Sequence, residues 1–161
     1  QPLLTPAEIE QLLIPRGSLT ATERLVVESH VSHTYDFLRK IPWTKHLQNV
    51  PKIAGSHHEK LDGSGYPQGL NAAEIPVQSQ MMTIADIYDA LTASDRPYKP
   101  RLSIDRTLAI LHQEAAAGKL DSNLLDLFEQ RQVYSVLSDS NFNWKYLLLI
   151  WRLKLSIFQY F

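Results

Sequence analysis

Apolar side chains recur at steps of three and four residues along most of this chain, which is the periodicity of helices with one buried face. Near the N-terminus, Thr5 to Glu8 combines a capping threonine, a proline at the first helical position and a glutamate three residues after the cap. This box predicts a helix to about Leu13, and a similar box starting at Thr20 predicts a longer helix to about Lys40. The longer helix places His30 on or beside an apolar face formed by Val26, Val27, Thr34, Phe37 and Leu38.

The middle of the chain predicts one short helix followed by a loop. The segment from Pro51 to about Glu59 can form a helix in which Ile53 and His57 share a face. A glycine-rich loop then runs to Leu70, and residues 71–74 have the composition of a single turn, which the proline at position 76 closes.

The strongest helical pattern lies between Val77 and Thr92, and its buried face is expected to hold Met81, Ile84, Ala85, Tyr88 and Leu91. Ser103 and Asp121 can each cap a further helix, the first of which should end near Ala117, before a glycine. The apolar positions of the last helix are Leu124, Leu125, Leu127 and Phe128. Because no strand pattern competes before about residue 138, the predicted class is all-α, as a helical bundle.

The final stretch, residues 138–161, is rich in apolar residues but lacks the caps and polar spacing of the segments before it. A membrane-spanning helix needs about 20 mostly apolar residues, and Arg152 and Lys154 interrupt the run, so no membrane span is expected. The stretch is either an amphipathic or partly buried end of the fold, or a separate tail with a sticky apolar surface. We predict a domain over residues 1–137, followed by a tail over 138–161 that is not part of it.

Length and composition are those of one ordinary globular domain. The chain has 161 residues, of which 44% are hydrophobic and 20% are charged, and these values exclude a disordered chain. With 16 Lys and Arg against 17 Asp and Glu, there is no electrostatic reason to expect binding to a nucleic-acid polymer or an acidic membrane. The absence of cysteine excludes disulfides and thiolate metal sites.

Candidate chemistry is concentrated where two adjacent histidines, His57 and His58, meet the glycine-rich loop. Imidazole is the commonest metal ligand, and glycines allow a close approach of the backbone. His30 and Asp86 fall on other predicted helices, each on or beside a face that should be buried. Either one alone is most simply a packing residue, but a buried carboxylate is costly unless a partner such as a metal ion compensates its charge. Together the four suit Fe, Mn, Zn or Ni, and room for several ions would suit two-metal phosphoester hydrolysis.

Three blocks of the sequence resemble a single family. Residues 57–67, which run from the His-His-Glu triplet through Gly65 and Tyr66 to Pro67, resemble the signature of the HD-GYP domain. This is the bacterial cyclic di-GMP phosphodiesterase branch of the HD phosphohydrolases. Residues 84–92 followed by 96–99 resemble the second signature block, and residues 17–30 resemble the helix of the family that ends in a ligand histidine. The blocks occur in the right order and spacing over about residues 16–100.

The resemblance implies a fold and an activity. The fold would be an HD-type bundle that holds two or three divalent metal ions, usually iron or manganese. The activity would be hydrolysis of cyclic di-GMP to pGpG, GMP or both, in second-messenger signalling in the bacterial cytoplasm. Metals would polarise the phosphoryl oxygen and activate a bridging water, while cationic side chains hold the phosphates.

The resemblance also implies roles for individual residues. Carried over by position, the metal ligands would be His30, His57, His58 and Asp86. Tyr66 lies where the family borders its substrate pocket, and it is our candidate catalytic residue. The other candidates for substrate binding are Gly65, Pro67, Arg96 and Lys99, of which the last two match basic residues that hold phosphates. Glu59 and Asp62 are expected either to fix the loop or to orient the metal ligands from outside the ligand set.

One feature departs from the family pattern. The namesake His-Asp pair should lie upstream of His30, and no His-Asp dipeptide occurs in this sequence. We expect the upstream half of the domain and a sensory domain to belong to a longer protein, so that the chain alone binds metal poorly and hydrolyses little. The alternative is a catalytically silent module that binds a nucleotide or a partner such as a diguanylate cyclase. A third interpretation, an unrelated HD-type nucleotide hydrolase, is disfavoured by the Gly-Tyr-Pro loop.

Overall fold

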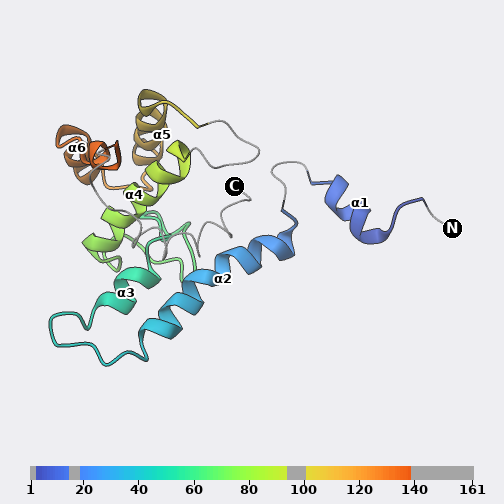
Figure 1. The fold of residues 1–161 in the computed structure, drawn as a ribbon, viewed down its shortest axis with the longest axis horizontal. Coiled ribbons are helices and arrows are strands. Elements are labelled where there is room, and N and C mark those ends of the chain that lie inside the picture. Colours follow the sequence, from blue (N-terminus) through green and yellow to red (C-terminus); the bar gives the residue numbers. More distant parts are fainter. Residues whose placement is uncertain (1–2, 15–18, 94–100, 139–161) are drawn as a thin grey trace. The chain divides into compact units, whose positions relative to one another are not determined.

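The computed structural model describes residues 3–14, 19–93 and 101–138, and every regular element in these ranges is helical (Figure 1). One isolated β-bridge pairs Asp62 with Asn71. The predicted all-α class is therefore confirmed. The elements are α1 (Pro6–Leu12), α2 (Ala21–Leu38), α3 (Val50–Gly55), α4 (Val77–Thr92), α5 (Ile104–Ala116), α6 (Ser122–Gln130) and the 3-10 helix η1 (Val133–Ser138).

The described residues divide into two compact units, and the division falls inside α2, after His30. The first unit contains α1 and the first part of α2, and both helices begin at the predicted capping boxes. The backbone N–H of Thr5 donates to the Glu8 carboxylate over 2.7 Å, and the Glu8 N–H donates to the Thr5 hydroxyl over 3.3 Å. Thr20 and Glu23 form the same reciprocal pair, at 2.8 and 3.2 Å, so each helix start is fixed by local hydrogen bonds.

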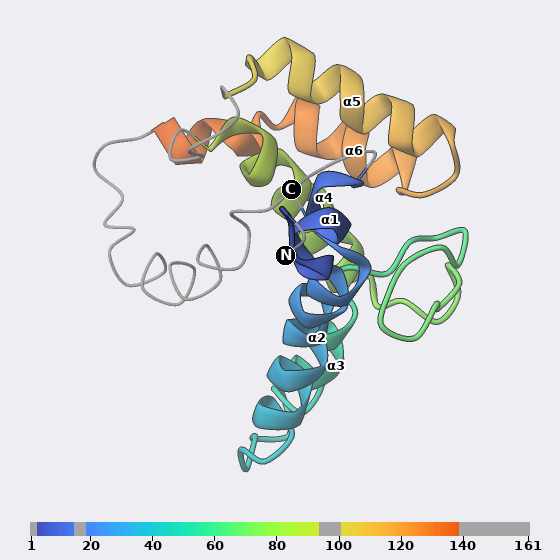
Figure 2. The same cartoon turned by 90° about the vertical axis from the view of Figure 1, so that its right-hand side faces the viewer.

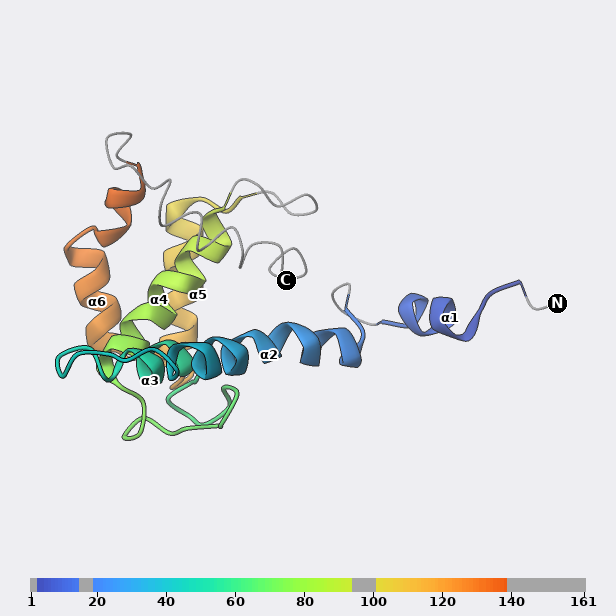
Figure 3. The same cartoon turned by 60° about the horizontal axis from the view of Figure 1, so that its bottom comes forward.

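The second unit is built around α4, α5 and α6. The last two lie side by side and are joined by a tight turn at Gly118, whose φ of 78° favours glycine (Figure 2). Helix α4 packs against both of them (Figure 3). Ser103 and Asp121 cap α5 and α6 as predicted, since their side chains accept backbone N–H groups of the first turn. The buried core consists of Ile84, Tyr88, Leu108, Leu111, Leu120, Leu125 and Phe128.

Helix α3 is shorter than the sequence predicted, because it ends at Gly55 rather than near Glu59. Two contacts lie at this end. A Cβ at Gly55 would lie 2.9 Å from the ring of Tyr35, so the glycine lets α3 approach α2 closely. The next residue, Ser56, leaves the helical conformation, and its hydroxyl donates to the Lys52 carbonyl over 2.7 Å. The histidine pair therefore lies in the turn after α3 and not on the helix.

Some predictions of buried positions were wrong. In α4, Ile84 and Tyr88 are buried as expected, but Met81 is 53% exposed and Ala85 is also exposed. The reason is that α4 buries a partly polar face, which includes Ser79, Thr83 and Asp86. In α2, Val27 and His30 are buried, whereas Val26 and Phe37 are exposed.

No helix in the described part of the chain combines the length and the apolar character that crossing a membrane requires. The predicted end of the domain near residue 137 falls within the last described element, η1. Residues 139–161, which make up nearly all of the predicted tail, lie outside the described residues. The division of the chain into a domain and a tail stays a prediction.

Candidate metal centre

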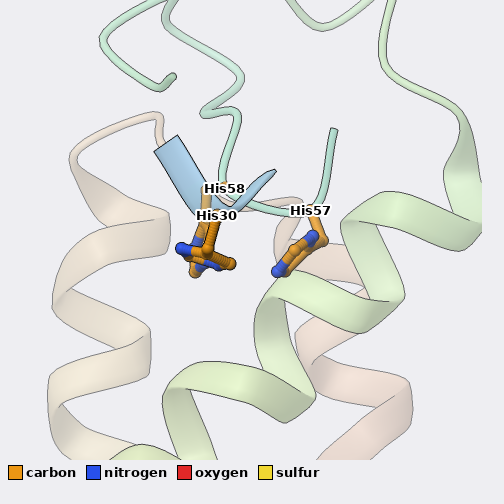
Figure 4. A group of neighbouring side chains, drawn as sticks. All are labelled: His30, His57 and His58. Carbon is orange, nitrogen blue, oxygen red and sulfur yellow. The ribbon is translucent and has the colours of Figure 1, made fainter. Parts of the chain in front are cut away.

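Three histidines from two segments lie close together, His30 from α2 and the adjacent pair His57 and His58 from the turn after α3 (Figure 4). Each histidine offers one ring nitrogen to this group, and the three nitrogens all lie within 4.8 Å of one another. Donors that share one ion at about 2.1 Å are at most about 4.2 Å apart, so a shift of roughly half an ångström would fit the set to a single ion. Two ions about 3.5–4 Å apart would also suit the spacing.

The main chain selects the tautomer of two of these histidines. The Nδ1 atom of His30 lies 2.6 Å from the Val27 carbonyl oxygen, and Nδ1 of His57 lies 2.6 Å from the Ala54 carbonyl oxygen. A carbonyl oxygen can only accept, so each Nδ1 must carry the proton and donate it. In the neutral ring Nε2 then bears the lone pair, which is the arrangement that orients metal-binding histidines.

Asp86 of α4 brings a carboxylate beside His58. Its Oδ2 atom lies 3.9 Å from Nδ1 of His58, and both side chains are nearly buried. This separation is too long for a hydrogen bond, but it is within the distance that two ligands of one ion can span. The convergence that the sequence interpretation required, an aspartate helix beside the paired imidazoles, is therefore present.

Buried hydroxyl groups attach the histidine turn to α4. The Thr83 hydroxyl lies 2.7 Å from the His57 carbonyl oxygen and 2.9 Å from that of Ser79, and its single proton is shared between these two acceptors. The Ser79 hydroxyl lies 2.9 Å from the Ile53 carbonyl and 3.0 Å from the hydroxyl of Ser56. The turn that carries the imidazoles is thereby fixed to the helix that carries Asp86.

The glycine-rich loop after the histidines is held by a buried carboxylate. Glu59 is 2% exposed, and its two oxygens accept the backbone N–H groups of Gln68 at 2.7 Å and Leu70 at 2.9 Å. Asp62 accepts both the backbone N–H and the hydroxyl of Ser64, at 3.0 and 2.6 Å. The loop-fixing roles predicted for Glu59 and Asp62 are confirmed.

The same loop returns to the histidines. A Cβ at Gly65 would come within 2.3–2.6 Å of the backbone of Glu59 and the residue after it, so only glycine fits there. The backbone N–H of Tyr66 then donates to the His58 carbonyl over 3.3 Å. The Tyr66 ring stacks on the His58 ring with 4.8 Å between centroids, and the peptide bond from Tyr66 to Pro67 is cis. The Gly-Tyr-Pro segment thus lies directly against one of the candidate ligands.

Lys60 is a cation near this site that the sequence did not single out. Burial lowers the pKa of its ammonium group, while the carboxylates of Glu114 and, more weakly, Asp86 oppose the shift. The position directly after the His-His-Glu triplet was its only signal in the sequence. The hydroxyls of Ser79 and Thr83 were also missed, because nothing in a helical pattern shows which residues 23–26 positions away they will contact.

The structure brings together most of the predicted site residues. These are His30, His57, His58, Tyr66 and Asp86, with Gly65 and Pro67 in the adjoining loop. The two predicted phosphate-binding residues, Arg96 and Lys99, lie outside the described residues. The ligand and substrate roles of all these residues stay predictions.

Comparison with known proteins places this geometry in context. Residues 3–124 match the HD domain family. A 3′3′-cGAMP-specific phosphodiesterase of Vibrio cholerae serotype O1 is 34% identical over 138 residues, which are 84% of this chain and 31% of that protein. Another from the same organism is 43% identical over 97 residues, covering 60% of this chain and 20% of the relative.

A further relative is a cyclic di-GMP phosphodiesterase response regulator of Xanthomonas campestris pv. campestris. It is 37% identical over 111 residues, which are 69% of this chain and 28% of that protein. The chain therefore spans between about a fifth and a third of the length of these curated relatives.

Proposed function

From the premise that this chain belongs to the HD domain family and is of the HD-GYP type, we propose that it supplies part of the metal centre of a cyclic-dinucleotide phosphodiesterase. One observation carries the proposal. Three imidazoles from two segments lie together, and the Asp86 carboxylate of a third segment lies 3.9 Å from one of them, His58. Imidazoles whose Nδ1 atoms are turned toward backbone carbonyls present Nε2 as a donor atom, and a carboxylate beside such imidazoles is a set that divalent metal ions bind.

The donor set fits divalent iron or manganese. Neutral imidazoles with a carboxylate are the mixed ligands that such metals accept. In this assignment His30, His57, His58 and Asp86 hold the ions, two or three of which belong to the complete domain. When bound, the ions would polarise a phosphoryl oxygen and lower the pKa of a water molecule.

The chain's own residues would bind and orient the substrate. Tyr66 is proposed to border the substrate, and this is supported by its stacking on His58. Arg96 and Lys99 are proposed to hold the phosphates as cations. The partly buried Lys60, whose ammonium group interacts more weakly with the Asp86 carboxylate than with Glu114, is proposed as a further cation near the site.

The proposed substrate class is the cyclic dinucleotides, with cyclic di-GMP as the first candidate and cleavage to pGpG or GMP as the reaction. A specific observation favours a second candidate, since two of the relatives are named for action on 3′3′-cGAMP. We further propose that an upstream half of the domain and a sensory domain complete the protein, and that diguanylate cyclases are its protein partners. A cytoplasmic location follows from this proposed role in signalling.

The test is an assay of the longest natural polypeptide that contains this sequence, loaded with iron or manganese and given each dinucleotide. Formation of pGpG or GMP supports the enzyme, and the preferred dinucleotide identifies the substrate. His57→Ala should abolish turnover while circular dichroism and the thermal midpoint show a folded bundle. The matched control is His112→Ala, which should leave turnover unchanged. His112 is an exposed residue of α5 that pairs with Glu129 of α6.

Bound metal without any product would overturn the enzyme and favour the silent binding module instead. Absence of metal binding, or equal metal binding by the wild type and His57→Ala, would overturn the metal centre itself.

A further inference from the structure

Thr83 is the buried residue whose hydroxyl reaches the peptide bond between the two adjacent histidines. That peptide carbonyl belongs to His57, and it lies 2.7 Å from Thr83 Oγ1. Thr83 is 3% exposed and stands in α4 three residues before Asp86. One side chain thus connects the backbone between two candidate ligands with the helix that carries a third.

Two serines extend this connection. Ser79, one turn before Thr83, has its hydroxyl 2.9 Å from the Ile53 carbonyl at the end of α3. The Ser56 hydroxyl lies 3.0 Å from that of Ser79 and 2.7 Å from the Lys52 carbonyl. Ser79 and Ser56 are 0% and 2% exposed. The last turn of α3 and the histidine turn are therefore bonded to α4 by hydroxyl groups, from which water is excluded.

The His57 residue is consequently held at two points. Its ring is fixed through Nδ1 by the Ala54 carbonyl, and its own carbonyl is fixed by Thr83. A ring oriented by one bond can still move with its peptide, whereas the second bond removes that movement. Partners outside the ligand set that orient ligands in this way commonly change metal affinity 10- to 100-fold when they are removed.

We infer that Thr83, supported by Ser79 and Ser56, is a positioning residue that sets the His57–His58 peptide relative to Asp86 for metal binding. The inference rests on the metal centre proposed above. Thr83 itself touches neither the metal nor the substrate, and it acts through the peptide that it binds.

The experiment compares Thr83→Val, which keeps the shape but loses the hydroxyl, with Thr83→Ser, which keeps the hydroxyl. The measurements use the longest natural polypeptide that contains this sequence, and they are Mn²⁺ affinity by titration calorimetry and the histidine ring resonances of the metal-free protein by NMR. Thr83→Val should weaken Mn²⁺ binding about 10- to 100-fold and shift the His57 and His58 resonances. Thr83→Ser should stay within about threefold of the wild type, because the donor remains.

The matched control is Thr107→Val. Thr107 is also fully buried, and its hydroxyl donates over 3.0 Å to the Ser103 carbonyl of its own helix region, in the core of α5. The Thr107→Val substitution should change the thermal midpoint without changing the Mn²⁺ affinity or the histidine resonances. If Thr83→Val unfolds, Ser79→Ala serves instead, with the same expected direction and a smaller loss.

The outcomes separate the positioning role of Thr83 from the existence of the metal centre. Equal Mn²⁺ affinity in Thr83→Val and Thr107→Val, with His57→Ala still deficient, overturns the positioning role and leaves the metal centre intact. If Thr83→Ser binds as weakly as Thr83→Val, shape and not the hydroxyl is responsible, and the inference is wrong. If His57→Ala binds Mn²⁺ like the wild type, the proposed centre fails first.

Discussion

The Glu59→Gln substitution tests how the glycine-rich loop is held beside the histidines. Both Glu59 oxygens accept backbone N–H groups, from Gln68 and Leu70, in a position that is 2% exposed. Glutamine has nearly the same shape but keeps only one oxygen, so an NH₂ group must face one of the backbone donors. The charge is also lost, and it strengthens both hydrogen bonds.

The magnitude follows from the two bonds. A hydrogen bond to a charged group contributes about 1.5–3 kcal/mol, and a neutral one about 1 kcal/mol. Losing two charged bonds and keeping one neutral bond therefore costs about 2–5 kcal/mol. At about 3 °C per kcal/mol for a chain of this size, the thermal midpoint should fall by roughly 6–15 °C.

The assay is thermal unfolding followed by circular dichroism, together with amide hydrogen exchange at the two donors. If the loop opens locally, exchange of the Gln68 and Leu70 amides should accelerate roughly 30- to 4,000-fold, because 1.4 kcal/mol corresponds to a factor of ten. The control is Glu74→Gln, an exposed carboxylate that accepts one N–H, from Asn71, at 3.1 Å. Its cost should be about 1 kcal/mol or less. Identical midpoints for the two variants, with wild-type exchange at both amides, would refute the role of Glu59.

Three further predictions concern other parts of the second unit. Gly65→Ala should lower stability by more than about 3 kcal/mol and abolish protection of the loop in hydrogen exchange, because the new Cβ meets the Glu59 backbone at 2.4 Å. Leu111→Ala should cost about 2–5 kcal/mol in chemical unfolding, since this side chain is fully buried in the core between helices. The Ser64 hydroxyl and then its N–H hold the pKa of the Asp62 carboxyl below its usual value. Stability from this pair is therefore present above pH about 3.9 and lost as the pH falls through the lowered pKa. An NMR titration should show the Asp62 pKa rising in Ser64→Ala.

Much of the fold could be predicted because its signals are local. Helix α4 spans the predicted range Val77–Thr92, and the caps at Thr5, Ser103 and Asp121 make the predicted bonds. The end of α3 could not be predicted, and it lies where Gly55 approaches Tyr35, a contact between helices that a helical pattern does not reveal. Periodicity indicates which positions can share a face, but the neighbouring elements decide which face is buried.

The site was predictable to a similar degree. His57, His58 and Asp86 were identified because a histidine pair beside a glycine loop and a carboxylate in an apolar helix are unusual in sequence. Thr83 was not, because a threonine inside a helix is ordinary and its acceptor lies 26 residues away. The exposure of Met81 could not be predicted for a similar reason. A partly polar face of α4 is buried where an apolar face was expected.

The groups that orient His30 and His57 are peptide oxygens three positions upstream. Every amino acid supplies such an oxygen, so this constraint imposes no residue type at Val27 or Ala54. Substitutions there can alter how well the interior fills while the imidazole protons keep their acceptors. In a protein with a similar centre, a search of the sequence for carboxylates that orient the histidines would therefore miss these backbone hydrogen bonds.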